Sequence, residues 1–93
     1  MICHVVLIKL KDKEKTDWVL EQARKVLGSV PGVQNLRIGT GIKVDYEYPI
    51  GFVMEFDDET VLESYQEHSE HVRFRDEVLA PLIDDKKVYD YEV

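Results

Sequence analysis

ICHVVLIKL, residues 2–10, is the stretch of this sequence that decides the fold. It is short, rich in β-branched residues and apolar at nearly every position, which predicts a β-strand. Successive side chains of a strand point to opposite faces. Both faces are apolar here: His4, Val6, Ile8 and Leu10 share one, and Cys3, Val5 and Leu7 share the other. Such a strand has to be covered on both faces.

Apolar side chains at helical spacing predict two helical segments. The first covers Trp18–Leu27 and should stop at Gly28, a residue type that commonly ends helices. The second extends from about Glu59 to Ile83, and its apolar stripe changes phase along the way. We therefore expect a break near Ser69 and an end or a kink at Pro81.

Three further strands complete the pattern. They are predicted for Val33–Ile42, Ile50–Phe56 and Lys87–Val93, where apolar and polar residues alternate. The resulting order is βαββαβ, and right-handed crossovers place both helices on the same side of the sheet. The predicted fold class is α+β and ferredoxin-like: a four-stranded antiparallel sheet with two helical layers on one face. We expect residues 1–93 to form a single domain.

The other face of that sheet would expose Cys3, Val5 and Leu7 to water. A contiguous exposed apolar patch usually marks an interface. Because a two-fold axis is the commonest symmetry of oligomers, the predicted partner is a second copy of the chain, packed sheet to sheet as a homodimer.

Composition excludes several other partners. The formal net charge is −7, which disfavours binding to a nucleic acid or an anionic membrane. No apolar run approaches the roughly 20 residues of a membrane span. Cys3 is the only cysteine, so no intrachain disulfide can form, which fits a cytoplasmic location.

Four segments of the chain resemble a known family. They are Cys3–Leu10, Val30–Val33, Tyr65–Phe74 and Val88–Glu92, and their order and spacing are similar to those of the stress-responsive A/B barrel domain (Dabb, dimeric α/β barrel) family. The resemblance implies two ferredoxin-like subunits whose sheets close into a dimeric α+β barrel. The family often has proline where this chain has Ser69, and Ser69 should cap the helical piece that follows.

The resemblance also implies candidate site residues. Some plant members are cofactor-free polyketide cyclases, and their catalytic tyrosine and histidine match Tyr65 and His71, with a strand-one histidine matching His4. Histidine suits a general base near neutral pH, and a tyrosine hydroxyl can donate to an enolate oxygen. We expect these three side chains to share a subunit pocket, with no cofactor, lined by Val6, Ile8, Val19, Ala23, Ile50, Phe52, His68 and Phe74.

The residues themselves leave alternatives open. Tyr65 and His71 could be core residues with satisfied polar tips, in a non-catalytic, stress-protective structural protein. A cofactor-free oxygenase or isomerase is a further alternative. His68 and His71 form an H-x-x-H pair, but catalytic zinc takes three protein ligands and no third is evident, so no metal is expected.

Overall fold

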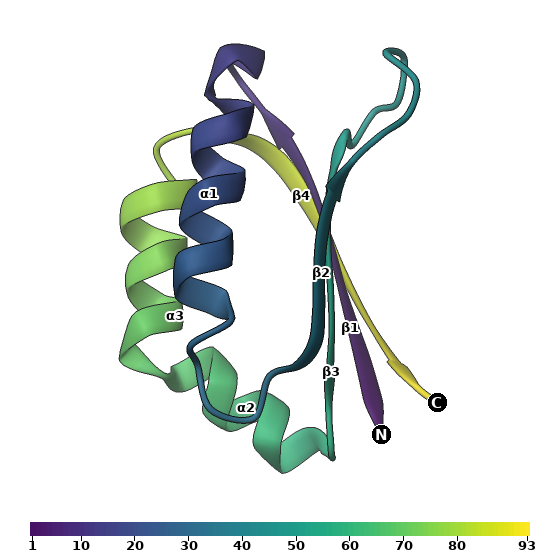
Figure 1. Cartoon of the computed structure of the whole chain (residues 1–93), viewed down its shortest axis with the longest axis vertical. Helices are drawn as coiled ribbons and strands as arrows, with labels where there is room; N and C mark the ends of the chain where they lie inside the picture. Colours follow the sequence, from purple (N-terminus) through teal and green to yellow (C-terminus); the bar gives the residue numbers. More distant parts are fainter.

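The computed structural model describes all residues 1–93, and they form one sheet covered on one face by helices (Figure 1). The elements in chain order are β1 (Ile2–Leu10), the 3₁₀ turn η1 (Lys13–Lys15), α1 (Thr16–Leu27), β2 (Gln34–Thr40), β3 (Ile50–Phe56), α2 (Glu59–Glu67), α3 (Ser69–Arg73), the π-helical segment η2 (Phe74–Leu79) and β4 (Ile83–Glu92). The sheet is antiparallel with strand order β2-β3-β1-β4. The predicted ferredoxin-like α+β fold is confirmed.

Strand β1 lies at the centre of the sheet, between β3 and β4. On its helix-facing side Ile2, His4, Ile8 and Leu10 are buried, as the alternation predicted. Strand β3 supplies the matching buried row Ile50, Phe52, Met54 and Phe56. Helix α1 closes the layer with its own buried side chains, so the core lies between the helices and the sheet.

The structure corrects two predicted boundaries. Strand β4 begins at Ile83, which was predicted to end the second helix, because the chain turns at Pro81 and pairs Ile83 with Leu10. The charged residues 84–86 precede the predicted strand Lys87–Val93, yet they belong to β4, because an edge strand tolerates charge on its exposed side. Strand β2 covers only Gln34–Thr40 and is shorter than predicted at both ends.

The predicted break in the second helical region is confirmed. Helix α2 ends at Glu67, and His68 has an extended backbone with φ −64° and ψ 136° before α3 begins. The cap of α3 differs from the expectation. Nδ1 of His68, rather than the hydroxyl of Ser69, accepts a hydrogen bond from the backbone N–H of Glu70 at 3.1 Å.

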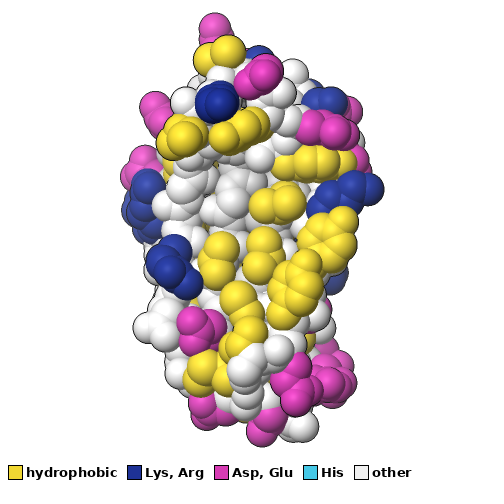
Figure 2. All heavy atoms as spheres, turned by 90° about the vertical axis from the view of Figure 1, so that its right-hand side faces the viewer, with side chains coloured by type: hydrophobic (Ala, Val, Ile, Leu, Met, Phe, Trp, Pro, Cys, Tyr) yellow, Lys and Arg dark blue, Asp and Glu magenta, His cyan; other side chains and the backbone are white.

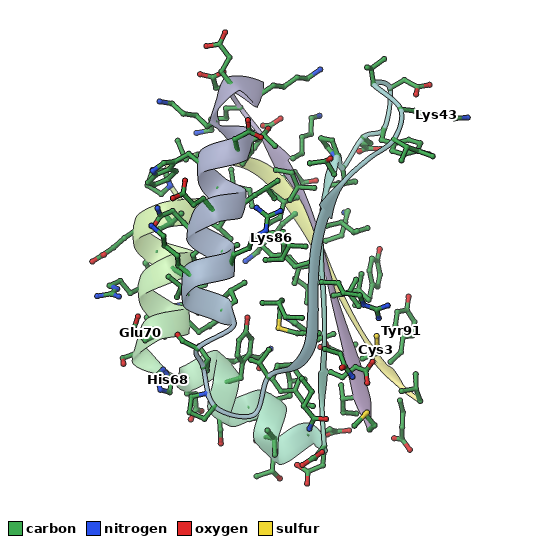
Figure 3. All side chains as sticks on the ribbon, in the orientation of Figure 1. Cys3, Lys43, His68, Glu70, Lys86 and Tyr91 are labelled. Atoms are coloured by element: carbon green, nitrogen blue, oxygen red, sulfur yellow. The ribbon has the colours of Figure 1, made fainter.

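The sheet face turned away from the helices carries a set of apolar side chains, which we call the open face (Figure 2). Cys3 and Tyr91 point away from the helical layer, and Val5 lies between Val53 and Tyr89 in the strand register (Figure 3). The set consists of Cys3, Val5, Leu7, Val53, Tyr89 and Tyr91. The Tyr89 and Tyr91 side chains stack with ring centroids 6.4 Å apart and stay about half exposed, at 47% and 53%. None of the helices is long and apolar enough to cross a bilayer.

A glycine fixes the turn between α1 and β2. Gly32 has φ +90°, and a Cβ added there would lie 2.5 Å from Cγ1 of Val61 in α2. We expect Gly32→Ala to lower the free energy of unfolding by about 2 kcal/mol or more, since it combines a left-handed backbone with a steric clash. Urea unfolding measures this effect. In the matched control Gly39→Ala the added Cβ meets no atom within 4 Å, so the change should stay within about 0.5 kcal/mol. Equal effects at the two positions would contradict the account.

Candidate functional site

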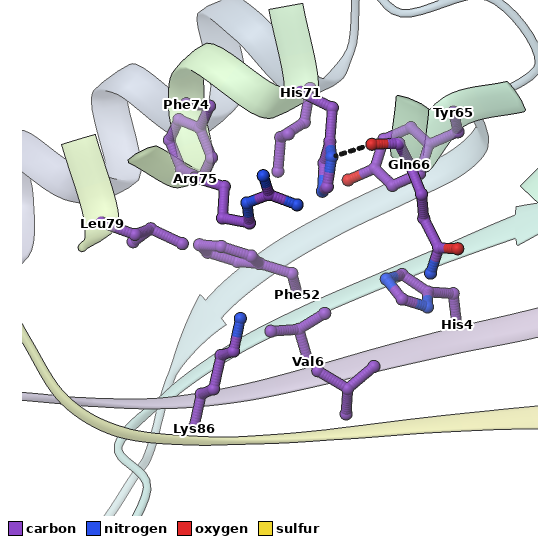
Figure 4. A pocket seen from close by; sticks show the side chains of 12 residues that line it. His4, Val6, Phe52, Tyr65, Gln66, His71, Phe74, Arg75, Leu79 and Lys86 are labelled. Atoms are coloured by element: carbon purple, nitrogen blue, oxygen red, sulfur yellow. Dashed lines mark hydrogen bonds between the residues drawn. The ribbon is translucent and has the colours of Figure 1, made fainter. Parts of the chain in front are cut away.

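A cavity of about 270 Å³ lies between the helix-facing side of the sheet and the helices α2, α3 and η2 (Figure 4). This volume is near the lower end of small-molecule sites, which hold roughly 300–1,000 Å³. The helical segments α1, α2, α3 and η2 and the strands β1, β3 and β4 contribute to the wall. The lining residues are His4, Val6, Leu27, Phe52, Tyr65, Gln66, His71, Phe74, Arg75, Leu79, Lys86 and Val88.

The helix break at His68 brings Tyr65 and His71 together. Six positions on an unbroken helix would leave the two side chains about 120° apart. The extended backbone of His68 turns α3 relative to α2, and the two rings lie with their centroids 4.5 Å apart. Both side chains line the same cavity.

Hydrogen bonding selects the tautomer of His71. Its Nδ1 lies 2.9 Å from the carbonyl oxygen of Gln66 (Figure 4). Because a carbonyl only accepts, Nδ1 carries the proton and donates it to this bond, which leaves Nε2 with a free lone pair in the neutral ring. Burial lowers the pKa of His71, and the charges of Arg75, His4 and Lys86 lower it further, while the bond to Gln66 opposes the shift. His71 is therefore neutral at pH 7 and able to accept a proton.

The hydroxyl of Tyr65 is a free donor. Tyr65 is 2% exposed, and burial alone raises the pKa of its hydroxyl above the ordinary value, so the group is protonated at neutral pH. The hydroxyl forms no hydrogen bond within the chain. Every side-chain polar atom that is fully enclosed does have a partner, so the hydroxyl oxygen is not fully enclosed. The Tyr65 hydroxyl therefore reaches the cavity and can donate to a bound molecule.

His4 is held by a cross-strand carboxylate. Its Nδ1 lies 2.5 Å from Oδ1 of Asp90, the residue directly opposite it on β4. His4 is only 4% exposed, and its ring packs edge-on against Tyr65 at a centroid distance of 5.9 Å. Since a carboxylate accepts, the Nδ1–H donates to Asp90 and the orientation of the ring is fixed.

The structure places the expected site residues in two groups. His4, Tyr65 and His71 meet at the cavity, and Val6, Phe52 and Phe74 line it as expected. Five expected lining residues do not line it. Ile8, Val19, Ala23 and Ile50 are at most 1% exposed and are packed into the hydrophobic core. His68 is occupied in capping α3 and lies on the outer side of the helical layer (Figure 3).

Six lining residues were missed: Leu27, Gln66, Arg75, Leu79, Lys86 and Val88. Arg75 and Leu79 follow His71 at intervals of four along one helical face, a signal that the sequence did contain. Lys86 and Val88 alternate with Asp90 on β4, but the predicted strand began only at Lys87 and left Lys86 outside it.

The structure contains no group of three or more His, Cys, Asp or Glu side chains placed to hold a metal ion. Nδ1 of His68 is bonded to the backbone N–H of Glu70, and Nδ1 of His71 to the carbonyl of Gln66. The two histidines of the H-x-x-H pair therefore have separate local partners.

The chain is similar to known proteins over its whole length. The family model described as Stress responsive A/B Barrel Domain (Dabb) matches residues 2–93. A solved Dabb family protein with a ferredoxin-like fold from Mesorhizobium loti is 28% identical, with a TM-score of 0.90 over 99% of this chain and 95% of that one. No protein of curated function matches the chain in sequence.

Two more distant structures share the fold. A dimeric ferredoxin-like protein of unknown function from Thermobifida fusca is 21% identical, with a TM-score of 0.85 over 99% of this chain and 90% of that one. A hydroxynitrile lyase from Passiflora edulis is 14% identical, with a TM-score of 0.82 over 99% of this chain and 92% of that one.

The lowered pKa of His71 predicts a pH dependence of stability. In the unfolded chain His71 takes up a proton at about pH 6.5. In the folded chain its pKa is lower, so protonation requires a lower pH. The stability contributed by neutral His71 is therefore complete above pH 6.5 and is lost as the pH falls through the folded-state pKa. Between pH 7.5 and pH 5, urea unfolding should show a larger decrease in the free energy of unfolding for the wild type than for His71→Gln. An NMR titration placing the pKa of His71 above 6.5 would refute the assignment.

Proposed function

This chain belongs to the stress responsive A/B barrel (Dabb) family, and we propose that its cavity binds a small, partly apolar carbonyl compound and transfers a proton on it without a cofactor. One observation carries the proposal. A free hydrogen-bond donor, the Tyr65 hydroxyl, and a free proton acceptor, Nε2 of His71, belong to rings in contact beside one cavity. Two unsatisfied groups of complementary chemistry are what enolisation of a carbonyl compound requires.

The reaction begins with removal of a proton from the carbon next to a carbonyl group. Nε2 of His71 accepts this proton, and the C–H electron pair moves into the enolate. The Tyr65 hydroxyl donates a hydrogen bond to the enolate oxygen, where negative charge develops. When a second carbonyl of the same molecule is in reach, the enolate carbon attacks it and closes a ring. The proton on His71 then passes to the new alkoxide, so that the enzyme returns to its starting state.

The His4–Asp90 pair is a positioning element in this scheme. The carboxylate of Asp90 fixes the ring of His4, and His4 packs on the edge of Tyr65. Tyr65 is thereby held between two histidines, with Phe56 also packed against its ring at 4.9 Å. A donor held rigidly in this way loses little entropy when the oxyanion forms.

The remainder of the wall determines what kind of molecule fits. Leu27, Phe52, Phe74 and Leu79 are apolar and buried. A ligand therefore gains most of its binding free energy from burying apolar surface, while the polar groups orient its reactive carbonyl. The Passiflora edulis enzyme is a lyase with this fold, which is consistent with an enzymatic role.

We further propose that the chain acts as a homodimer joined through the open face. Cys3, Val5, Leu7 and Val53 form an apolar centre, and the half-exposed rings of Tyr89 and Tyr91 flank it. Figure 2 shows the charged side chains gathered mainly around the margin of this face. An apolar centre with a polar rim is typical of homodimer interfaces, and the Thermobifida fusca protein of the same fold is described as dimeric.

Proton transfer can be tested on a simple ketone. Phenylacetone in deuterium oxide exchanges its α-protons slowly, and NMR follows the exchange. We expect the wild type to accelerate it, His71→Gln to lose at least about a hundredfold of that acceleration, and Tyr65→Phe to lose a similar factor. The matched control Tyr46→Phe changes a tyrosine outside the cavity wall and should retain the rate. Exchange no faster than in buffer, or unaffected by both cavity substitutions, would refute the proposed chemistry.

The dimer can be tested at the centre of the open face. Val5→Asp would place an unpaired charge between the two sheets and should cost several kcal/mol of association free energy. Sedimentation velocity at micromolar concentration should show a dimer for the wild type and a monomer for the variant. Val44→Asp makes the same change at a 96% exposed position and should remain dimeric. A monomeric wild type would overturn this part of the proposal.

A further inference from the structure

The charges of the cavity wall are opposite in sign to those of the whole chain. The chain has 19 acidic and 12 basic residues, yet the lining contains Arg75 and Lys86 and not one aspartate or glutamate. Both basic residues are exposed, whereas the apolar lining residues Leu27, Phe52, Phe74 and Leu79 are buried. The two cations therefore mark the mouth of the cavity, and the apolar side chains mark its interior.

Lys86 is directed beneath the helical layer. It lies opposite Ile8 in the strand register and alternates with Lys87, so its side chain is on the helix-facing side of β4. Figures 3 and 4 show it pointing into the space between the sheet and the helices. The ion pairs of the structure do not include it. An ammonium group that forms no ion pair, at the edge of an apolar cavity, favours a bound anion.

Arg75 faces the same space from the opposite wall (Figure 4). Its Nε donates to Asp76 at 2.9 Å, and Nη2 makes a longer contact of 3.5 Å with the same carboxylate. A guanidinium has five N–H donors, so Asp76 offsets part of the charge and leaves donors free. Arg75 belongs to the π-helical segment η2, in which the N–H of Ala80 bonds to the carbonyl of Arg75 at 2.9 Å. Such π-helical turns are rare and are frequently found at functional sites.

We propose that the ligand of this cavity is an organic acid, whose carboxylate is bound at the mouth by Lys86 and Arg75 while its apolar part lies against Phe52 and Phe74. This inference rests on the proposed function, since it names the ligand class of the same site. Charge-assisted hydrogen bonds to a carboxylate are roughly twice as strong as neutral ones. They would also place the carbonyl end of a keto acid at a constant distance from Tyr65 and His71.

The charges of Lys86 and Arg75 also act on the base. Both contribute to lowering the pKa of His71. A carboxylate bound between them would offset that field, so the pKa of His71 should rise when an acid binds. The neutral amide of the same shape should leave it almost unchanged. This shift is a readout that nonspecific adsorption of the apolar part would not produce.

The test uses para-butylbenzoate and para-butylbenzamide, which share their shape and differ in charge. Isothermal titration calorimetry at low salt should give at least about tenfold tighter binding of the carboxylate. Lys86→Gln and Arg75→Gln should each reduce that preference severalfold without weakening binding of the amide. Lys25→Gln, which removes an equal charge from the exposed Glu21–Lys25 pair on α1, should retain the preference. NMR should show the pKa of His71 rising with the carboxylate only.

The outcomes separate this inference from the proposed function. If the two probes bind equally well and both still inhibit the exchange of phenylacetone, the cavity is the site but does not select acids, and the inference is wrong. If the carboxylate is preferred but Lys86→Gln and Arg75→Gln match Lys25→Gln, the mouth is not where the acid binds, and the inference is again wrong. If neither probe binds and the wild type gives no exchange, both proposals fail together.

Discussion

Strand β1 has to be shielded from water on both faces, and most of the architecture answers this requirement. On one face Ile2, Ile8 and Leu10 are buried beneath the helices. On the other, Cys3, Val5 and Leu7 are only half-buried within a single chain. Each apolar square ångström left in water forgoes about 25 cal/mol of stabilisation. The helical layer meets half of the requirement, and the proposed second subunit would meet the other half.

The helical layer does not pack perfectly, and the candidate site lies where it departs from regularity. An unbroken helix from Glu59 would present one continuous stripe to the sheet. The extended residue His68 divides it into α2 and α3, and η2 continues with wider turns. These three segments supply six of the residues that line the cavity: Tyr65, Gln66, His71, Phe74, Arg75 and Leu79. An unfilled cavity costs the fold packing energy, and a ligand that fills it can recover part of that energy.

The sequence predicted the elements that depend on local patterns. Alternation identified both faces of β1, and the phase change of the apolar stripe located the break near Ser69 to within one residue. It failed where an interaction joins distant segments. Nothing local reveals that Asp90 lies opposite His4, or that Ile83 pairs with Leu10 across the sheet. For the same reason Lys86 was missed: it lay outside the predicted strand, and only its pairing with Ile8 places it on the inner face.

Strand β4 forms one edge of the sheet, and an unpaired edge can recruit further strands into aggregates. Its sequence IDDKKVYDYE carries charge on both faces, from Asp84 to Glu92. Another strand approaching this edge would have to desolvate those charges, so growth into an extended cross-β array is opposed. The apolar side chains of β4 project perpendicular to the sheet and not outward in the direction in which another strand would pair. The molecule is thus able to expose an apolar sheet face and still resist polymerisation through its edge strand.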